Sequence, residues 1–406
     1  MLRRSGEIIS KEPVDTAKAG FLDQEDKYPK MQLKAIVLSW LVSAFYLAAG
    51  ETTIDSLFTV KLNTDESGGC KARSSLLKQY LQESKDLAAA GLQAIEHAQD
   101  SSASQHDVAK RYLQAYFAIG EDDATALTSV KDNLQKVSNF LSGKKLDNTP
   151  RLYCHDTWLK RHARTDIAWD TDGNEIRTMD KDGVEHPLSI ENCEQYKELF
   201  WYYDDGRKVW KTNKQVPYWS DDLSQYLADA DYGSGGGFCT GSNNQGGTQH
   251  MTTPSTITLC PISFTSSSDH TPKLGSRSPA NGQKGGIKLP KILPRSVTLY
   301  HELFHLVLGS EATPDATYEW HGQELLLKTP ELVITKDYAE EHRDILGWIM
   351  PEDTYGLTAA EAIRRNPESY AWFSVAYWYF MQTKWSKGDD SQRWSFHSGL
   401  SQLVKI

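Results

Sequence analysis

The sequence SVTLYHELFHLVL at residues 296–308 contains the pentapeptide His301-Glu302-Leu303-Phe304-His305, which has the HExxH spacing. Four helical positions advance about 6 Å and turn slightly more than once, so both imidazoles project from one face and can bind a single ion. Glu302 lies one step round the same turn, where its carboxylate faces the open side of that ion. The spacing therefore predicts a zinc site in which Glu302 is the general base.

Mostly apolar residues flank these polar groups on both sides, at 297–300 and 306–308. This pattern predicts a helix that is buried on several sides, rather than the surface helix that a chance HExxH match would form. Two histidines and a glutamate in such a helix need partners, because unpaired polar groups in the interior are costly. A bound metal ion would meet that need.

A catalytic zinc needs a third protein ligand. The longer HExxHxxGxxH motif is excluded, since Leu308 stands at its glycine position and Glu311 at its third histidine. The next residues contain the pattern T-x-D-x-x-Y, from Thr313 through Asp315 to Tyr318. This pattern resembles the third element of the aspzincins, the deuterolysin and peptidyl-Lys metalloendopeptidase family. The resemblance implies that Asp315 is the third ligand and that Tyr318 stabilises the oxyanion of the tetrahedral intermediate.

The resemblance runs from about residue 70 to about residue 383, in the order of the family. It includes the cysteine-led first helix that begins at Gly69-Cys70, the segment TITLCPISF at 256–264, and the segment NPESYAWF at 366–373. It implies an α+β, zincin-like metalloprotease fold with N-terminal helices, a small sheet, the HExxH helix and C-terminal helices. It also implies one Zn²⁺ per chain.

Two departures from the family concern the ligand loop. Ala312 and Glu319 stand where the family usually has glycines, so the loop must turn differently. Glu311, Glu319 and His321 are therefore reserve candidates for the third ligand.

A further departure concerns the substrate pocket, to which we assign Glu368 and Tyr370. Lysine-specific members carry two acids in the pocket for the residue after the scissile bond. Glu368 fits the first of these, but Ala371 occupies the second position. Strict lysine specificity is therefore not expected.

The composition is that of a globular protein: 39% of the 406 residues are hydrophobic and 11% are aromatic. The formal net charge of −10 gives no electrostatic reason to expect nucleic acid, which is bound through Lys and Arg. We expect a monomer with a linker at 51–69, a single catalytic domain at 70–385 that has a large insertion around 155–255, and a C-terminal tail at 386–406.

An apolar run at residues 35–49 is shorter than the roughly 20 residues that span a bilayer, and it ends in the small residues Ala48-Ala49-Gly50. We interpret residues 31–50 as a signal peptide of a secreted, extracellular protein without a stable membrane span. Residues 1–30 would then be a gene-model extension or a disordered tail, with Met31 as the true start. A short signal anchor with a cytoplasmic tail is the alternative.

The five cysteines form at most two disulfides and leave one thiol over. They are Cys70, Cys154, Cys193, Cys239 and Cys260. The family resemblance suggests that Cys70 pairs with Cys154 or Cys193 and that Cys239 pairs with Cys260. The sequence contains no Asn-x-Ser/Thr glycosylation site.

Hydrophobic periodicity predicts three helices within 71–142, with breaks near 100–104 and 120–123. A removable prodomain, cut at Lys144-Lys145, is the alternative for this region. Later helices are predicted over 337–350 and 358–385, with proline breaks at Pro351 and Pro367. Strands are predicted at 151–154, 167–169, 208–211 and 256–260.

These observations predict a secreted zinc endopeptidase that hydrolyses protein or peptide substrates. The zinc ligands are His301, His305 and Asp315, and the catalytic residues are Glu302 and Tyr318. The alternative is a secreted protein of the same fold that binds zinc without catalysis, as a scavenger or in surface interactions. A third possibility is an inactive derivative whose altered loop fails to bring Asp315 to the ion.

Overall fold

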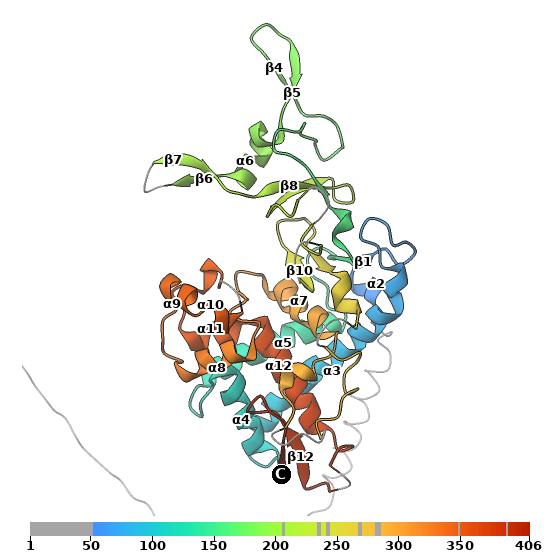
Figure 1. Ribbon diagram of the computed structural model, residues 1–406. Coiled ribbons are helices and arrows are strands. Elements are labelled where there is room, and N and C mark those ends of the chain that lie inside the picture. Colours follow the sequence, from blue (N-terminus) through green and yellow to red (C-terminus); the bar gives the residue numbers. More distant parts are fainter. Residues whose placement is uncertain are drawn as a thin grey trace, which may run out of the picture. The chain divides into compact units, whose positions relative to one another are not determined.

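The computed structural model describes residues 52–406 except for 205–207, 234–236, 241–243, 267–269, 281–285, 348–349 and 387–388. The predicted extension and signal peptide lie outside the described residues. Within them, eleven α-helices and several small sheets form a mixed α+β fold (Figure 1). No helix of this part has both the length and the apolar character needed to cross a membrane.

The three predicted N-terminal helices are confirmed. They are α3 (Ser74–Gln99), α4 (His106–Phe117) and α5 (Ala124–Leu141), and the short α2 (Ile54–Leu57) precedes them. Asp123 caps α5 by accepting a hydrogen bond from the backbone amide of Ala126. Gly91 lets α3 pack closely against its neighbours, because a Cβ atom there would lie 2.9 Å from Ser374 Oγ.

A four-stranded sheet has the order β1 (Thr59–Val60), β2 (Arg151–Tyr153), β11 (Thr256–Leu259) and β10 (Gly246–Gln249). The first three strands are parallel, and β10 is antiparallel to β11 at the edge. The strand predictions at 151–154 and 256–260 are confirmed. Strand β10 was not predicted, since its sequence GGTQ lacks the alternating apolar residues typical of a strand.

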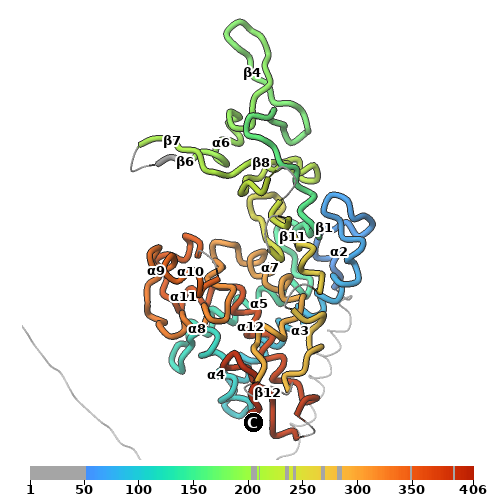
Figure 2. Tube along the Cα trace, in the orientation of Figure 1, coloured from blue at the N-terminus to red at the C-terminus, as the bar shows by residue number. Residues whose placement is uncertain are grey.

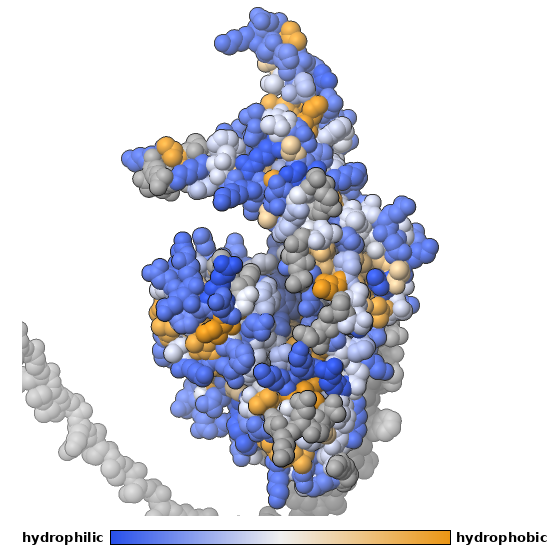
Figure 3. Space-filling view, in the orientation of Figure 1, coloured by the Kyte–Doolittle hydropathy of each residue, from blue (hydrophilic) through white to orange (hydrophobic). Residues whose placement is uncertain are grey.

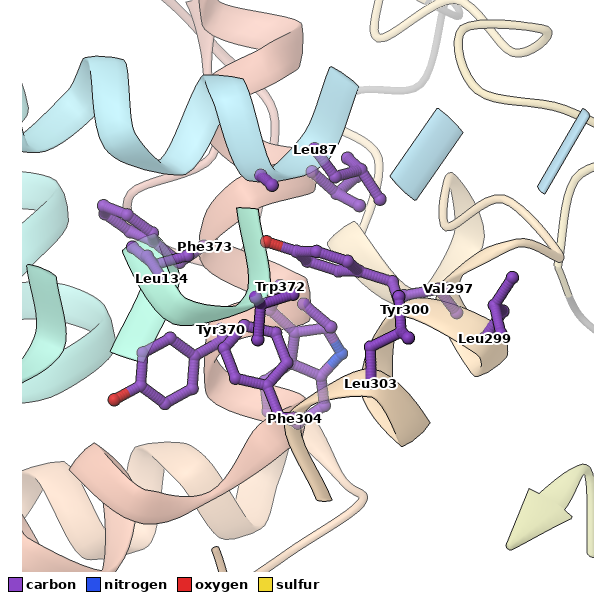
Figure 4. Packing of buried hydrophobic residues seen from close by; sticks show 14 of the residues in the cluster. Leu87, Leu134, Val297, Leu299, Tyr300, Leu303, Phe304, Tyr370, Trp372 and Phe373 are labelled. Atoms are coloured by element: carbon purple, nitrogen blue, oxygen red, sulfur yellow. The ribbon is translucent and has the colours of Figure 1, made fainter. Parts of the chain in front are cut away.

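The HExxH segment forms helix α7 (Val297–Leu308), which lies in the main hydrophobic core. Helix α7 packs on α12 (Pro367–Met381) in this core: the Phe304 ring stacks on Tyr370, and the Tyr300 hydroxyl lies 3.1 Å from Ser374 Oγ (Figure 4). The aromatic residues of α12 are therefore core residues. The prediction over 358–385 is realised as two helices, α11 (Ala359–Arg365) and α12, which meet at Pro367.

A second cluster of buried apolar residues lies in the segment after the ligand loop. It is built from α8 (Trp320–Lys328), α9 (Lys336–Glu341), α10 (Arg343–Leu346) and α11. The helix predicted over 337–350 is wrong as a single element: it is divided at His342 and ends before Gly347. Gly347 ends it because its φ of +86° is a left-handed conformation that favours glycine.

The residues between β2 and β10 form several small elements, whose course Figure 2 shows. A separate cluster of buried apolar residues lies within them. These elements are the sheet β3 (Lys160–Arg161), β8 (Val216–Ser220) and β9 (Gln225–Asp229), the hairpins β4 (Arg177–Met179) with β5 (Glu185–Pro187) and β6 (Trp201–Asp204) with β7 (Val209–Thr212), and α6 (Glu194–Phe200). Strand β7 confirms the prediction near 208–211, whereas residues 167–169 form isolated bridges only. The Trp158 Nε1 donates to Thr258 Oγ1 at 3.0 Å, which joins this region to the main sheet.

The C-terminal segment 386–406, expected as a tail, contains a hairpin of β12 (Gln392–Ser395) and β13 (Gln402–Lys405). Phe396 follows β12 and is fully buried in the main core, so this segment is part of the folded unit. The outer surface in view is mainly hydrophilic with scattered apolar residues (Figure 3), in keeping with the net charge of −10.

Disulfides join Cys70 to Cys154 and Cys239 to Cys260, and Cys193 is a buried free thiol. The first bond connects the start of the N-terminal helices to the end of β2. The second encloses β10 and β11, the antiparallel pair at one edge of the main sheet. The pairing of Cys239 with Cys260 is the one that the family resemblance implied, and Cys154 is the partner it offered first for Cys70.

Candidate metal centre

Three side chains converge beside α7. The Nε2 atoms of His301 and His305 lie 3.2 Å apart, and Asp315 Oδ1 lies 3.1 Å from the first and 3.2 Å from the second. Zinc–nitrogen and zinc–oxygen bonds of about 2.0–2.1 Å at tetrahedral angles would separate such ligand atoms by about 3.3 Å. The triangle of His301, His305 and Asp315 therefore has the size of three corners of a zinc tetrahedron, and the group could hold one metal ion.

The Asp315 carboxylate gives this triangle a negative charge that suits a cation. Its Oδ1 atom is buried and has no hydrogen-bond partner, although two ring nitrogens lie nearby. Burial raises the pKa of Asp315, but the neighbouring His301 and His305 outweigh burial and hold the pKa well below its ordinary value. An ionised oxygen without a donor is costly in the interior, and a metal ion would supply its missing partner.

The other ring nitrogen of each histidine is held by a hydrogen bond. His301 Nδ1 lies 2.9 Å from Glu368 Oε2, and His305 Nδ1 lies 3.1 Å from Thr313 Oγ1. Thr313 Oγ1 donates its own hydrogen to the carbonyl of Gly309 at 2.8 Å, so it accepts from His305. These contacts favour a proton on each Nδ1, so that in the neutral imidazoles each Nε2 lone pair would face the centre, as metal-binding histidines require.

Glu302 is buried beside the sheet edge. Thr248 of β10 donates through Oγ1 to Glu302 Oε2 at 2.8 Å and also lies 3.2 Å from the Glu302 carbonyl. The backbone of Gly246 leaves room for this carboxylate, because a Cβ atom there would lie 3.3 Å from Glu302 Oε1. Just after β10, His250 Nε2 donates to the His305 carbonyl at 2.9 Å. Strand β10 and the turn after it therefore hydrogen-bond to α7 at two residues, Glu302 and His305.

Tyr318 lies at the rim of the centre, with 44% of its surface exposed. Its hydroxyl donates to Asp315 Oδ2 at 2.7 Å, and its ring is stacked on the His301 ring with centroids 5.8 Å apart. Asp315 thus turns one oxygen to the histidines and the other to Tyr318. Although much of the side chain is exposed, desolvation, followed by the charge of Asp315, raises the pKa of Tyr318 well above its ordinary value, so the phenol stays protonated and can donate.

The reserve ligands lie outside the triangle. Glu311 is exposed, the Glu319 side chain packs near Gly347, and His321 pairs with Glu324 at 3.1 Å on the surface. Among the described residues, the only group within metal-binding distance is His301, His305 and Asp315.

The two pocket candidates have different positions. Glu368 lies at the centre, where it binds His301. Tyr370 is fully buried in the core, where its hydroxyl donates to the Arg364 carbonyl and accepts from Asn133. The assignment of Tyr370 to the pocket is therefore wrong, because core contacts surround its ring and satisfy its hydroxyl.

Three residues at this centre were not predicted, namely Thr248, His250 and Thr313. Thr313 belongs to the T-x-D-x-x-Y pattern, so the motif itself could have indicated it. Thr248 and His250 come from a strand and turn far upstream of α7 and carry no recognisable spacing to it. No family model, curated protein or solved structure matches this chain, so its function is inferred from the residues and geometry above.

Proposed function

We propose that this chain is a secreted zinc endopeptidase of the aspzincin type with a zincin-like fold. The observation that carries the proposal is the placement of Asp315 Oδ1 at 3.1 and 3.2 Å from the two HExxH imidazoles. Asp315 lies beside both histidines although the loop lacks the family's glycines, which supports the ligand role that the resemblance implies. The two disulfides are in keeping with an oxidising compartment such as the cell exterior.

His301, His305 and Asp315 would hold the ion. Bound by these residues, a zinc ion would supply Lewis-acid chemistry, by which the pKa of a water falls to about 7. Glu302, held by Thr248, accepts the proton of the attacking water and delivers it to the leaving amine. The Tyr318 phenol, which donates to Asp315 Oδ2 in this structure, would turn to donate its one hydrogen to the developing oxyanion. These side chains all lie at the candidate metal centre.

The position of Glu302 favours a peptide as substrate. Strand β10, which contacts Glu302, is an edge strand of the main sheet in the described part of the chain. Backbone groups on an open strand edge can pair with an extended peptide. A polypeptide bound along β10 would therefore lie beside the general base.

Lysine specificity is not part of the proposal. The Glu368 carboxylate is bound to His301, and Ala371 is fully buried in the core. Neither position offers a free acid for a lysine side chain of the substrate.

Cleavage of casein by the purified full chain, with and without a chelator, tests the proposal. Cleavage should be chelator-sensitive and should disappear in Glu302→Gln, while zinc content stays at one per chain. Glu311→Gln, which removes an exposed acid from the adjacent loop, is the matched control and should retain activity. Bound zinc without cleavage would support the non-catalytic zinc-binding protein. Neither zinc nor cleavage would indicate an inactive derivative.

A further inference from the structure

The loop that carries Asp315 depends on contacts from other elements. Residues 309–319 form neither helix nor strand. At the start of the loop, the backbone amide of Thr313 donates to the Gly309 carbonyl. The next backbone amide that donates to a backbone carbonyl is that of Gln323, which bonds to Glu319 at the start of α8. The segment between them contains both Asp315 and Tyr318. Its conformation must therefore be fixed largely by side chains.

Thr317 is the anchor of this segment. It is fully buried, and its Oγ1 atom donates to the Leu346 carbonyl at 2.9 Å. Its own carbonyl accepts from Asn366 Nδ2 at 3.1 Å. Gly322 permits this close packing, because a Cβ atom there would lie 2.1 Å from Thr317 Oγ1. Thr317 is thus held from three sides, two residues after Asp315 and one before Tyr318.

Asn366 belongs to a chain of fully buried polar side chains. Its amide nitrogen lies 3.4 Å from Ser369 Oγ, which donates to Gln323 Oε1 at 2.9 Å. Gln323 Nε2 in turn donates to the Tyr116 carbonyl at 2.8 Å. Such a chain is rigid, since each bond orients the next group. It connects α4, α8 and the start of α12 to the Thr317 carbonyl.

The start of α12 therefore reaches the metal centre by two routes. Glu368, two residues after Asn366, binds the Nδ1 atom of His301. Asn366 binds the loop of Asp315. The Asn366 Oδ1 atom is buried without a hydrogen-bond partner, which lowers the stability of the fold. The hydrogen bond from Nδ2 to the Thr317 carbonyl offsets part of this loss.

We propose that Asn366 is a positioning residue for the metal site: its amide holds the Thr317 carbonyl and so keeps Asp315 at the distance from both imidazoles that a shared ion requires. The inference rests on the metal-binding part of the proposed function and is independent of proteolysis. Contacts of this outer kind typically change metal affinity by about 10–100-fold when they are removed.

The test compares zinc affinity in Asn366→Ser and in the wild-type full chain, by competition with a chromophoric chelator. Serine is also a favoured N-cap residue, which is the position of Asn366 before α12, but it is too short to reach the Thr317 carbonyl. We expect the dissociation constant for zinc to rise at least about 10-fold. The visible spectrum of the Co²⁺-loaded protein should change as well, because Asp315 moves relative to the histidines.

Asn133→Ser is the matched control. It removes an amide that donates to Tyr370, also on α12, but that has no bond to the ligand loop. This variant should bind zinc and Co²⁺ as the wild type does, even if its melting temperature falls. Asn366→Asp, which keeps the side-chain shape and lacks the N–H donor, repeats the test should the serine variant not fold.

Wild-type zinc affinity and an unchanged Co²⁺ spectrum in a folded Asn366 variant would overturn the inference. A wild-type chain that binds no zinc would overturn both this inference and the proposed function. Zinc binding without casein cleavage would end the proteolytic proposal alone.

Discussion

The Nδ1 atom of His301 lies 2.9 Å from Glu368 Oε2, so a carboxylate on α12 orients an imidazole of the candidate metal centre on α7. Burial lowers the pKa of His301, but Asp315, followed by Glu368, outweighs burial and raises the pKa well above its ordinary value. The same negative surroundings that favour a proton on His301 favour a metal cation in its place. Glu368 is therefore both an orienting group and part of the charge balance of the centre.

Replacement of Glu368 by alanine should weaken zinc binding by about 10–100-fold, because His301 loses the acceptor that fixes its tautomer. Glu368→Gln should lose much less zinc affinity than Glu368→Ala, since the glutamine amide oxygen can still accept the hydrogen bond from His301 Nδ1. Isothermal titration with Zn²⁺ measures both changes. Glu324→Ala, which removes the exposed partner of His321, is the control. Equal affinities in the alanine and wild-type proteins would refute the orienting role.

Asp315→Ala should reduce zinc affinity further than any change outside the triangle, because it removes a direct ligand. Metal content after dialysis, measured by elemental analysis, checks this. Glu311→Ala, in the same loop but exposed, should keep its zinc. An unchanged metal content in Asp315→Ala would transfer the third-ligand role to Glu311, Glu319 or His321.

Thr248→Val should lower kcat by about 10-fold and leave zinc content unchanged. The valine keeps the shape of the side chain but cannot donate to Glu302, whose carboxylate is then less precisely held. Thr248→Ser restores the hydroxyl and should restore most of kcat. Steady-state kinetics on a peptide substrate separate this change from one in KM. A serine variant as slow as the valine variant would argue against the hydrogen bond.

Local patterns predicted the parts of the centre that lie on one segment of chain. The HExxH spacing was sufficient for His301, Glu302 and His305, because a helix determines their relative positions. Asp315 and Tyr318 required a family resemblance, since their loop has no regular backbone. The contacts of Glu302 with Thr248, and of His301 with Glu368, were not predictable, because they depend on how β10 and α12 pack against α7.

The fold shows the same division between local and distant determinants. The periodicity of residues 71–142 predicted α3, α4 and α5, whose apolar faces repeat at helical spacing. Strand β10 has no such pattern and exists because it pairs with β11. Tyr370 was misplaced because an aromatic residue near the start of a helix can face either core or cleft, and only the positions of Asn133 and Arg364 decide.

Tyr318→Phe should retain zinc and lose about 10²–10³-fold in kcat, the usual effect of removing one oxyanion donor. The hydroxyl donates to Asp315 Oδ2, which is not the oxygen that faces the histidines, so the ligand triangle should persist. Zinc titration and kinetics on the same preparation provide the two readings. A large loss of zinc would instead make Tyr318 a support for Asp315, and unchanged kcat would remove it from catalysis.

Glu83 should make the stability of the fold dependent on pH. This buried residue of α3 accepts hydrogen bonds from Ser296 Oγ at 2.6 Å, just before α7, and from the Leu274 amide at 3.1 Å. Burial raises the pKa of Glu83, and these hydrogen bonds offset only part of that effect.

A carboxyl group whose pKa is higher in the folded than in the unfolded state binds its proton more tightly when folded. Its contribution to stability is complete below the unfolded-state pKa and is lost as the pH rises through the folded-state pKa. The free energy of unfolding of the wild type, relative to Glu83→Gln, should therefore fall as the pH rises above the ordinary glutamate pKa of about 4.3. Urea unfolding at several pH values measures the difference. Parallel pH profiles for the two proteins would show that Glu83 has an ordinary pKa in the fold.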